Sequence, residues 1–277
     1  MSEPRWRVIV DNDFAGDPDG LVSLAHVLLT DDVSVELITC TPVDPRLAEL
    51  AGVDGSASAS LAARNAHALL EVVGRSGPEV VAGAETFNAA GEPSNAARAI
   101  VDACLAEHGP PLVILCGGPL TNVAAAIALE PRICERAILV WIGGSVEGSA
   151  EYNRDADASA ADAVLSSPMP IVQVPREVYE RLRVSVAEVT YDLAEASFVG
   201  AWLAERLLDL PAFVTLHGVI TLGDSALAML VALDPGFRPF TDDSDAPRLR
   251  QLTDIDTRLV WGDFLAKLRL HDRGTHP

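Results

Sequence analysis

Short, uninterrupted apolar runs alternate along the chain with longer segments in which apolar residues recur every three or four positions. A short run bounded by turn residues is typical of a buried strand, and the longer period is typical of an amphipathic helix. The pattern predicts strands over residues 7–10, 33–40, 78–83, 111–117, 137–144 and 170–175. It predicts helices over residues 21–29, 59–74, 95–108 and 158–166, and one that begins at Thr121.

Strands and helices therefore alternate through the first two thirds of the chain. This order predicts an α/β fold: a Rossmann-like, mostly parallel sheet with helices on both faces. The remainder, residues 176–277, is more helical and irregular, and we expect it to contribute extra C-terminal helices. The sequence shows no internal repeat, low-complexity segment or linker, so we expect residues 1–277 to form a single domain.

Acidic residues and glycines directly follow four of the predicted strands. Parallel α/β sheets place their chemistry beyond the carboxyl ends of their strands. Glycine lets a backbone approach a ligand closely, and acids supply charge. The strand ends carry Asp11 to Asp19, Thr39 to Asp44, Gly117-Gly118 and Gly143-Gly144. These residues predict one acidic, glycine-lined rim.

The strongest local signal is VIVDNDFAGDPDG (8–20), which has carboxylates at Asp11, Asp13, Asp17 and Asp19. Four unpaired acids would repel one another, and hard cations such as Ca²⁺ and Mg²⁺ prefer oxygen ligands. The alternative is an exposed acidic turn whose last two acids favour the N-terminus of the next helix. An EF-hand is excluded by register, because Ala15 and His26 would occupy its first and twelfth positions.

Three later segments carry weaker signals. LCGGPLTNVAAAIALEP (115–131) has a tight strand-to-helix turn, which steric room alone explains. GGSVEGSAEYNRDADASAADAVL (143–165) places Glu151, Asn153 and Asp157 where they could hold vicinal hydroxyls or cap a helix. VITLGDSALAMLVAL (219–233) has Asp224 at the start of an apolar helix, as a ligand or as a cap.

Charge and cysteine usage narrow the possible partners. The chain has 40 acidic and 20 basic residues, a net charge of -20, which disfavours nucleic acids and anionic membranes. The basic residues are 19 arginines and a single lysine, Lys267. The first apolar run is too short to predict a signal peptide, no stretch predicts a membrane span, and widely spaced cysteines indicate reduced thiols. We therefore expect a cytoplasmic protein with four unpaired cysteines: Cys40, Cys104, Cys116 and Cys134.

The four segments in this order and spacing resemble the inosine–uridine-preferring nucleoside hydrolase family over roughly residues 6–235. In that family an aspartate cluster ends the first strand, a GPLTN turn follows the fourth, and a Glu-aromatic-Asn segment follows a Gly-Gly strand end. A late aspartate completes a Ca²⁺ site. The counterparts here are DNDFAGDPDG (11–20), GPLTN (118–122), EYN (151–153) and GD (223–224).

The resemblance implies a calcium-dependent N-ribohydrolase, which converts a riboside and water into a base and ribose. Asp11, Asp13, Asp224 and the carbonyl of Gly117 would bind Ca²⁺, and Asp13 would also orient or deprotonate the attacking water. Glu151 and Asn153 would hold the ribose hydroxyls. An anionic rim suits the positive charge that develops on ribose during cleavage. Relatives often assemble as homodimers or homotetramers.

The chain departs from the family pattern around the first cluster. The family's acid pair falls on Asp19-Gly20, so glycine stands where the family has a metal-binding acid. Asp17, in a segment with two extra residues, is the expected replacement ligand, while Asp19 keeps a ribose-binding role. Asp44 stands in the strand-two loop where the family often has a sugar-binding asparagine.

A second departure concerns the leaving base. Gly223 stands where purine-cleaving members carry a histidine that protonates the leaving group. No other histidine is an obvious acid; His67 and His217 are the nearest candidates. VPREVYERL (174–182), with Arg176 and Tyr179, is the segment expected to form a different base pocket.

Two other functions compete with hydrolysis. A haloacid-dehalogenase-type phosphatase also begins with a strand and two aspartates, but it needs a downstream cation, usually lysine. Here the single lysine lies beyond every predicted core strand. A non-catalytic homologue that binds a riboside or a metal is the other alternative, supported by Gly20 and by the missing leaving-group histidine.

Overall fold

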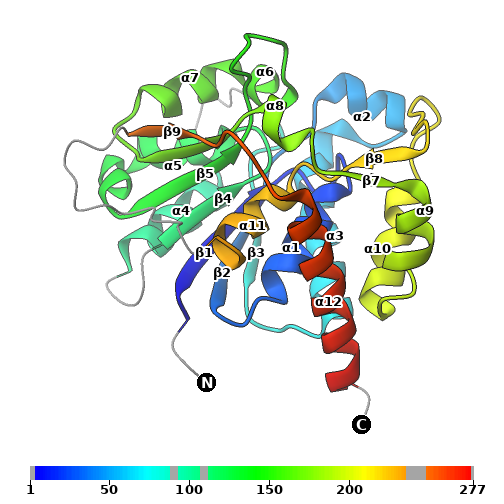
Figure 1. Cartoon of the computed structure of the whole chain (residues 1–277). Helices are drawn as coiled ribbons and strands as arrows, with labels where there is room; N and C mark the ends of the chain where they lie inside the picture. The colour runs from blue at the N-terminus through cyan, green and yellow to red at the C-terminus, as the bar shows by residue number, and fades with distance from the viewer. Residues whose placement is uncertain (1–3, 88–92, 107–111, 235–247, 276–277) are drawn as a thin grey trace.

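The centre of the structure is a seven-stranded sheet with strand order β3-β2-β1-β4-β5-β6-β9. The computed structural model describes residues 4–87, 93–106, 112–234 and 248–275 (Figure 1). All six neighbouring strand pairs are parallel. The strands are β1 (Trp6–Asn12), β2 (Val33–Cys40), β3 (Glu79–Ala82), β4 (Leu112–Cys116), β5 (Ala137–Ile142), β6 (Ile171–Val174) and β9 (Leu249–Gln251).

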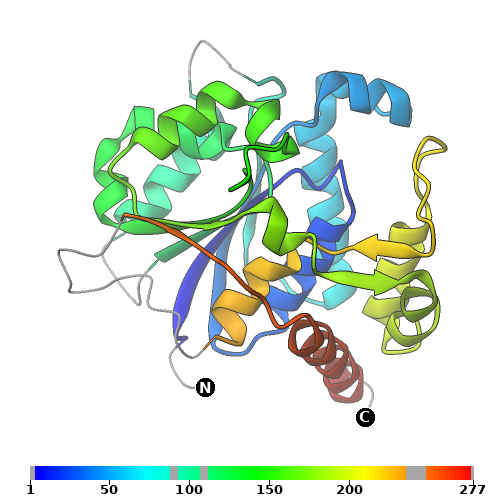
Figure 2. The same ribbon diagram turned by 45° about the horizontal axis from the view of Figure 1, so that its top comes forward.

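Helices cover both faces of the sheet, as the two views in Figures 1 and 2 show. One face packs against α4 (Asn95–Leu105), α5 (Thr121–Leu129) and α7 (Ala158–Ser166). The larger set on the other face is α1 (Asp19–Leu28), α3 (Ser58–Val73), α10 (Phe198–Leu208), α11 (Ser225–Ala232) and α12 (Thr257–Thr275).

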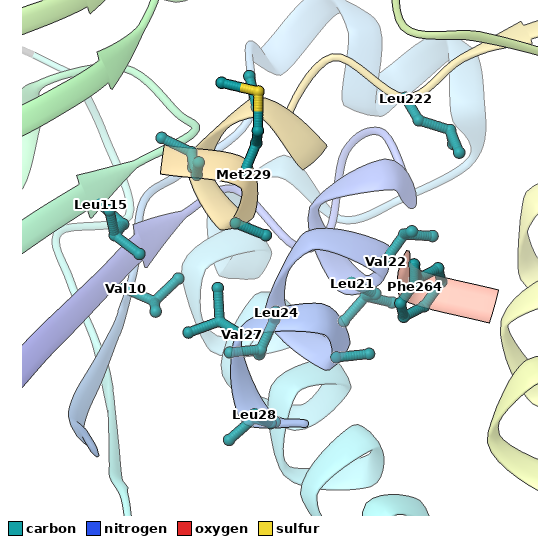
Figure 3. Close-up of a cluster of buried hydrophobic side chains, with 14 of the residues drawn as sticks. Val10, Leu21, Val22, Leu24, Val27, Leu28, Leu115, Leu222, Met229 and Phe264 are labelled. Carbon is teal, nitrogen blue, oxygen red and sulfur yellow. The ribbon is translucent and has the colours of Figure 1, made fainter. Parts of the chain in front are cut away.

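Strand β1 shows why the sheet is covered on both sides. Its side chains alternate between the faces: Val8 and Val10 belong to one buried cluster and Ile9 to the other. In Figure 3, α1 lies between the sheet and α12, with Leu24 on one side and Phe264 beside Leu21. This packing fixes α1, whose first residues belong to the acidic segment.

Smaller elements surround this frame. β7 (Arg183–Ser185) and β8 (Val219–Thr221) form a two-stranded antiparallel ribbon. The short helices are α2 (Pro45–Ala51), α6 (Tyr152–Ala156), α8 (Arg176–Tyr179) and α9 (Val186–Glu188). Three further turns are the 3-10 helices η1 (Gly55–Ala57) and η2 (Pro131–Glu135) and the π-helical turn η3 (Val189–Leu193).

The predicted α/β fold with a parallel sheet and helices on both faces is confirmed. The strand over 33–40 and the helix over 158–166 have the predicted bounds, and the other predicted elements differ by a few residues at their ends. Helix α4 ends at Leu105, and residues 107, 108 and 111 of the predicted elements lie outside the described residues. That residues 1–277 form a single domain stays a prediction.

The C-terminal third contributes more than the expected helices. Its strand β9 pairs with β6 and extends the sheet, which the sequence analysis did not predict. Within the described ranges, none of the helices has the length and apolar character needed to cross a membrane. The four cysteines are all buried and unpaired, as expected.

Candidate active site

The candidate site lies where the strand order reverses, at the carboxyl ends of β1, β2 and β4. β1 pairs with β2 on one side and with β4 on the other. Backbone hydrogen bonds hold the loops beyond these strands together: Thr41 N–H donates to the Asn12 carbonyl at 3.0 Å, and Gly117 N–H to the Asp11 carbonyl at 3.0 Å. Ligands of open α/β sheets bind at such a reversal, because the loops on either side diverge there.

Asp11, at the end of β1, is completely buried and hydrogen-bonded. Its Oδ1 accepts hydrogen bonds from Thr39 Oγ1 at 2.6 Å and Asn122 Nδ2 at 2.9 Å, and Cys116 Sγ donates to its Oδ2 at 3.5 Å. Burial raises the pKa of Asp11 to about 6, although these donors oppose the shift. Direct metal binding by Asp11 stays a prediction, and its Oδ2, which has only the long Cys116 contact, is the oxygen with remaining acceptor capacity.

Asp13 opens the loop after β1 and is 8% exposed. Burial raises its pKa well above the usual range, and the nearby charges of Asp224, Asp17 and Asp11 raise it further. No Arg, Lys or His among the described residues forms an ion pair with any of these four carboxylates. The cluster therefore has an uncompensated negative charge, which a cation or bound protons must offset.

Asp19 and Asp224 join the first turn of α1 to the start of α11. Asp224 N–H donates to Asp19 Oδ2 at 3.0 Å, and Ser23 Oγ donates to the Asp224 carbonyl at 2.7 Å. Neither carboxylate caps its own helix. Burial raises both pKa values, that of Asp224 to about 7. Simple helix capping therefore does not explain either side chain.

Asn12 connects β1 to Asp224. Its Nδ2 donates to Asp224 Oδ2 at 2.7 Å, and its Oδ1 accepts from the Asp13 N–H at 2.8 Å. A Cβ added at Gly20 would lie 2.8 Å from Asn12 Nδ2, and one added at Gly117 would lie 2.4 Å from it. Both glycines are therefore sterically required beside this amide.

The segment after β5 forms the opposite wall. Asn153 Nδ2 donates to the carbonyl of Gly117 at 2.8 Å and to that of Ile142 at 2.9 Å. Glu151 is 4% exposed and accepts four hydrogen bonds. Its donors are the backbone N–H groups of Gly144, Asn153 and Arg154 and the hydroxyl of Tyr179. Glu151 thus caps α6 while facing the same rim as Asp13.

These strand ends and helix starts match one known family. The sequence model of the family described as "Inosine-uridine preferring nucleoside hydrolase" matches residues 8–258. The chain belongs to this family. Members are hydrolases that act on N-glycosyl compounds, so the family assignment also identifies this chain as an enzyme of that class.

Similar proteins agree with the assignment. An uncharacterized protein from Schizosaccharomyces pombe is 29% identical over 234 residues, 71% of each chain. The pyrimidine-specific ribonucleoside hydrolase RihA from Enterobacter sp. is 32% identical over 109 residues, which are 37% of this chain and only 35% of the relative. Matches to the pyrimidine-specific enzymes are thus local.

Solved structures show the same fold. A plant nucleoside hydrolase aligns with a TM-score of 0.73 at 19% identity, covering 96% of this chain and 99% of the other. An inosine-uridine preferring nucleoside hydrolase from Bacillus anthracis has a TM-score of 0.69 at 18% identity, covering 95% of this chain and 99% of the other.

Three of the predicted site residues lie at the periphery of this nucleoside hydrolase's site. Asp17 is exposed and accepts a hydrogen bond from the Asp19 N–H at 3.1 Å. Asp44 caps α2 through Oδ1, and its N–H donates to the Tyr152 hydroxyl at 3.0 Å. Arg176 pairs with Glu180 and donates to the Ala150 carbonyl at 2.8 Å. Their metal or substrate contacts stay predictions.

Asn12 and Tyr152 are not among the site residues predicted from the sequence, and Tyr179 was predicted there only as part of a base pocket. The charge of Asp13 contributes to the raised pKa of Tyr152, after burial, so this phenol lies near the cluster. The Tyr179 ring packs where a side chain at residue 223 would project. Signals for Asn12 and Tyr152 were present, because each lies between two residues that were singled out.

The donor set suits a hard divalent cation in its chemistry. It offers the buried carboxylates of Asp13 and Asp224 and the carbonyl of Gly117, all oxygen ligands. As the side chains lie, no three His, Cys, Asp or Glu residues within the described ranges converge on a common metal position. The four predicted aspartate ligands, Asp11, Asp13, Asp17 and Asp224, are thus not gathered around one point in this arrangement of side chains, and metal binding stays a prediction that the uncompensated charge favours.

Proposed function

We propose that this chain is a calcium-dependent N-ribohydrolase, which cleaves the N-glycosidic bond of a ribonucleoside to give a free base and ribose. The observation that carries the proposal is the cluster of Asp13, Asp19 and Asp224, which are buried at the strand-order reversal without a cationic partner among the described residues. Family membership supports the reaction class.

Asp13, Asp224 and the Gly117 carbonyl are the proposed cation ligands, with Asp17 as a further carboxylate at the rim. The bound Ca²⁺ would supply fixed positive charge that orients hydroxyl groups and lowers the pKa of water. Asp11 remains in the proposal as the carboxylate beneath Asp13, held by its three donors.

Asp13 is the proposed proton acceptor for the attacking water. In the metal-free protein, burial and the neighbouring carboxylates raise the pKa of Asp13. A bound cation would oppose this shift and keep Asp13 ionised, as a proton acceptor must be. Water attacks the anomeric carbon as the bond to the base breaks, so the pair of electrons leaves with the base, which takes up a proton from the surrounding water. Asp19, Glu151 and Asn153 would bind the ribose hydroxyls, and the negative charge of Asp19 and Glu151 would stabilise the oxocarbenium-like transition state.

The base is recognised on the side formed by α8 and the start of α11. There Gly223 offers no proton donor, and the Tyr179 ring occupies the adjacent space. Asp44 and Arg176 are proposed to contact the substrate from the rim. Similar proteins are named for inosine, guanosine, uridine and pyrimidine substrates, so purine and pyrimidine ribosides are the compounds to test. A cytoplasmic location and a homodimer or homotetramer stay predictions.

A non-catalytic riboside-binding homologue remains the competing function, because Gly20 and Gly223 each remove an expected side chain. Phosphatase chemistry has less support. Lys267 pairs with Asp263, and this carboxylate also contacts His26, in the last turn of α1. The chain's single lysine is thus already paired with a carboxylate. It lies at the C-terminal end of α1, whereas Asp19 of the candidate site lies at the N-terminal end.

The decisive experiment measures ribose release from a panel of purine, pyrimidine and nicotinamide ribosides, with chelator and with added Ca²⁺. We expect chelation to abolish release and Ca²⁺ to restore it. Asp13→Asn should lower kcat by a factor on the order of 10² to 10⁴. Metal binding without release of any base would select the non-catalytic homologue, and intact hydrolysis in Asp224→Ala would show that the assigned site is wrong.

A further inference from the structure

The amide of Asn12 lies at the centre of the proposed metal site. It is 1% exposed, and both of its polar atoms are hydrogen-bonded. Its Oδ1 accepts from the backbone N–H of Asp13 at 2.8 Å, which fixes the orientation of the amide. The nitrogen therefore faces Asp224 Oδ2, to which it donates at 2.7 Å.

This amide occupies space beside two residues without side chains. A Cβ at Gly20 would lie 2.8 Å from Asn12 Nδ2 and 3.2 Å from Asp224 Oδ2. A Cβ at Gly117 would lie 2.4 Å and 2.5 Å from the same two atoms. Asn12, Gly20 and Asp224 are thus sterically linked: a side chain at residue 20 and the present position of the amide exclude each other.

We propose that Asn12 is a positioning residue of the metal site, whose amide holds Asp224 in the cation-free protein and competes with the cation for Asp224 Oδ2. The inference rests on the proposed function, since it takes Asp224 to be a cation ligand. The Asn12 amide is a neutral donor among the buried carboxylates, where an aspartate would add a further negative charge. The chain therefore keeps an ordered site without metal, and it binds Ca²⁺ less tightly than a site with one more carboxylate would.

The informative variant is Asn12→Asp, which keeps the shape of the side chain and changes one donor into an acceptor. One oxygen still accepts from the Asp13 N–H. The other faces Asp224 Oδ2 at hydrogen-bonding distance, so the two carboxylates repel each other when both are ionised, and a cation between them removes the repulsion. We expect this variant to have a lower Tm than the unmodified protein in chelator and a larger rise of Tm on adding Ca²⁺.

Isothermal titration of the metal-free protein with Ca²⁺ gives the affinity directly. The added carboxylate should lower Kd about tenfold, because ligand charge tunes calcium affinity. Asn65→Asp is the matched control: Asn65 Nδ2 donates to the Phe14 carbonyl at 2.9 Å, so its change adds the same charge near the same loop. A merely structural role for Asn12 predicts equal losses of Tm with and without Ca²⁺. Such equal losses, or an unchanged Kd, would overturn the proposal.

A second pair of variants tests the steric link without any metal. Gly20→Ala should lower Tm in chelator, because its new methyl group meets the amide. The same change in an Asn12→Ala background should cost much less. Equal costs in both backgrounds would refute the link. Chelator-resistant hydrolysis by the unmodified protein would instead contradict the proposed function, whatever the outcome for these variants.

Discussion

The hydroxyl of Tyr179 donates a hydrogen bond to Glu151 Oε1 at 3.0 Å, joining helix α8 to the proposed ribose-binding wall. The same ring lies against the chain at residue 223, where an added Cβ would be 2.9 Å from Tyr179 Cδ2. One aromatic side chain therefore connects the carboxylate proposed to bind the sugar with the position that lacks a leaving-group acid. Both relationships can be tested separately.

The first prediction concerns the hydroxyl. Tyr179→Phe removes one of the four donors to Glu151 and leaves the ring in place, so we expect KM for the riboside to rise about threefold, consistent with the loss of one hydrogen bond. The free energy of unfolding should fall by about 1 kcal/mol. Steady-state kinetics and urea unfolding measure the two effects. An unchanged KM would show that this hydrogen bond does not position Glu151 for substrate.

The second prediction concerns Gly223. Gly223→Ala should lower the free energy of unfolding by about 1–3 kcal/mol, because its Cβ would overlap the Tyr179 ring. In a Tyr179→Ala background the same substitution should cost less than about 0.5 kcal/mol, since the ring is gone. Urea unfolding of the four proteins of this double-mutant cycle gives both values.

The control for this cycle is Gly262→Ala in α12, where the added Cβ would have no described atom within 4 Å apart from the helix's own backbone and its chain neighbours. That variant should be more stable than the parent by about 0.5–1 kcal/mol, because alanine favours the helix. Equal costs for Gly223→Ala in both backgrounds would mean that its effect comes from the backbone and not from Tyr179.

The central strands of the main sheet could be predicted because they are buried on both faces and therefore appear as continuous apolar runs. β4 and β5, in which every residue is buried, are examples. Strand β9 has no such run: two of its three residues are half-buried and the third is exposed. It is a strand because it pairs with β6. Edge strands of this kind depend on tertiary contacts that local sequence does not encode.

The sequence was sufficient to predict which loops form the site, but not which of their atoms are in contact. Asp13 and Asp224 were identified from their places after a strand and before a helix. The partner of Asp224 was not, because Asn12 lies 212 residues away and nothing local distinguishes its amide from a spacer between aspartates. Likewise, Gly223 indicated a missing acid but not that Tyr179 fills the space.

The third prediction separates catalysis from stability at Asp13. Asp13→Asn removes a negative charge from a buried cluster in which Asp224 and Asp17 repel it. In chelator we therefore expect the variant to be at least as stable as the parent, with a gain of about 1 kcal/mol or more in the free energy of unfolding. Its hydrolytic activity should be largely lost. A large loss of stability in chelator would show that Asp13 has a structural role instead.

The fourth prediction concerns His26, through which helix α1 contacts the C-terminal helix α12. His26 on α1 is completely buried, and its Nε2 lies 2.8 Å from Asp263 Oδ2 on α12. Burial lowers the pKa of His26 from 6.5, and the charge of Lys267 lowers it further, while Asp263 opposes the shift. Since the folded state then binds the proton less readily than the unfolded state, stability should fall as the pH drops below about 6.5.

The test compares the parent with His26→Gln, which does not titrate. Below pH 6.5 the free energy of unfolding of the parent should fall, relative to that of His26→Gln, by up to about 1.4 kcal/mol per pH unit. Above pH 6.5 the difference between the two proteins should stay constant. Carboxylates other than Asp263 titrate equally in both proteins. Although burial opposes the shift, the hydrogen bonds of His26 and Lys267 lower the pKa of Asp263 to about 2, so the comparison is made above the usual titration range of aspartate, where the difference reports the imidazole. Lys267→Gln should flatten the slope, because it removes a charge that lowers the pKa of His26. A pH-independent difference would mean that His26 does not change its protonation on unfolding.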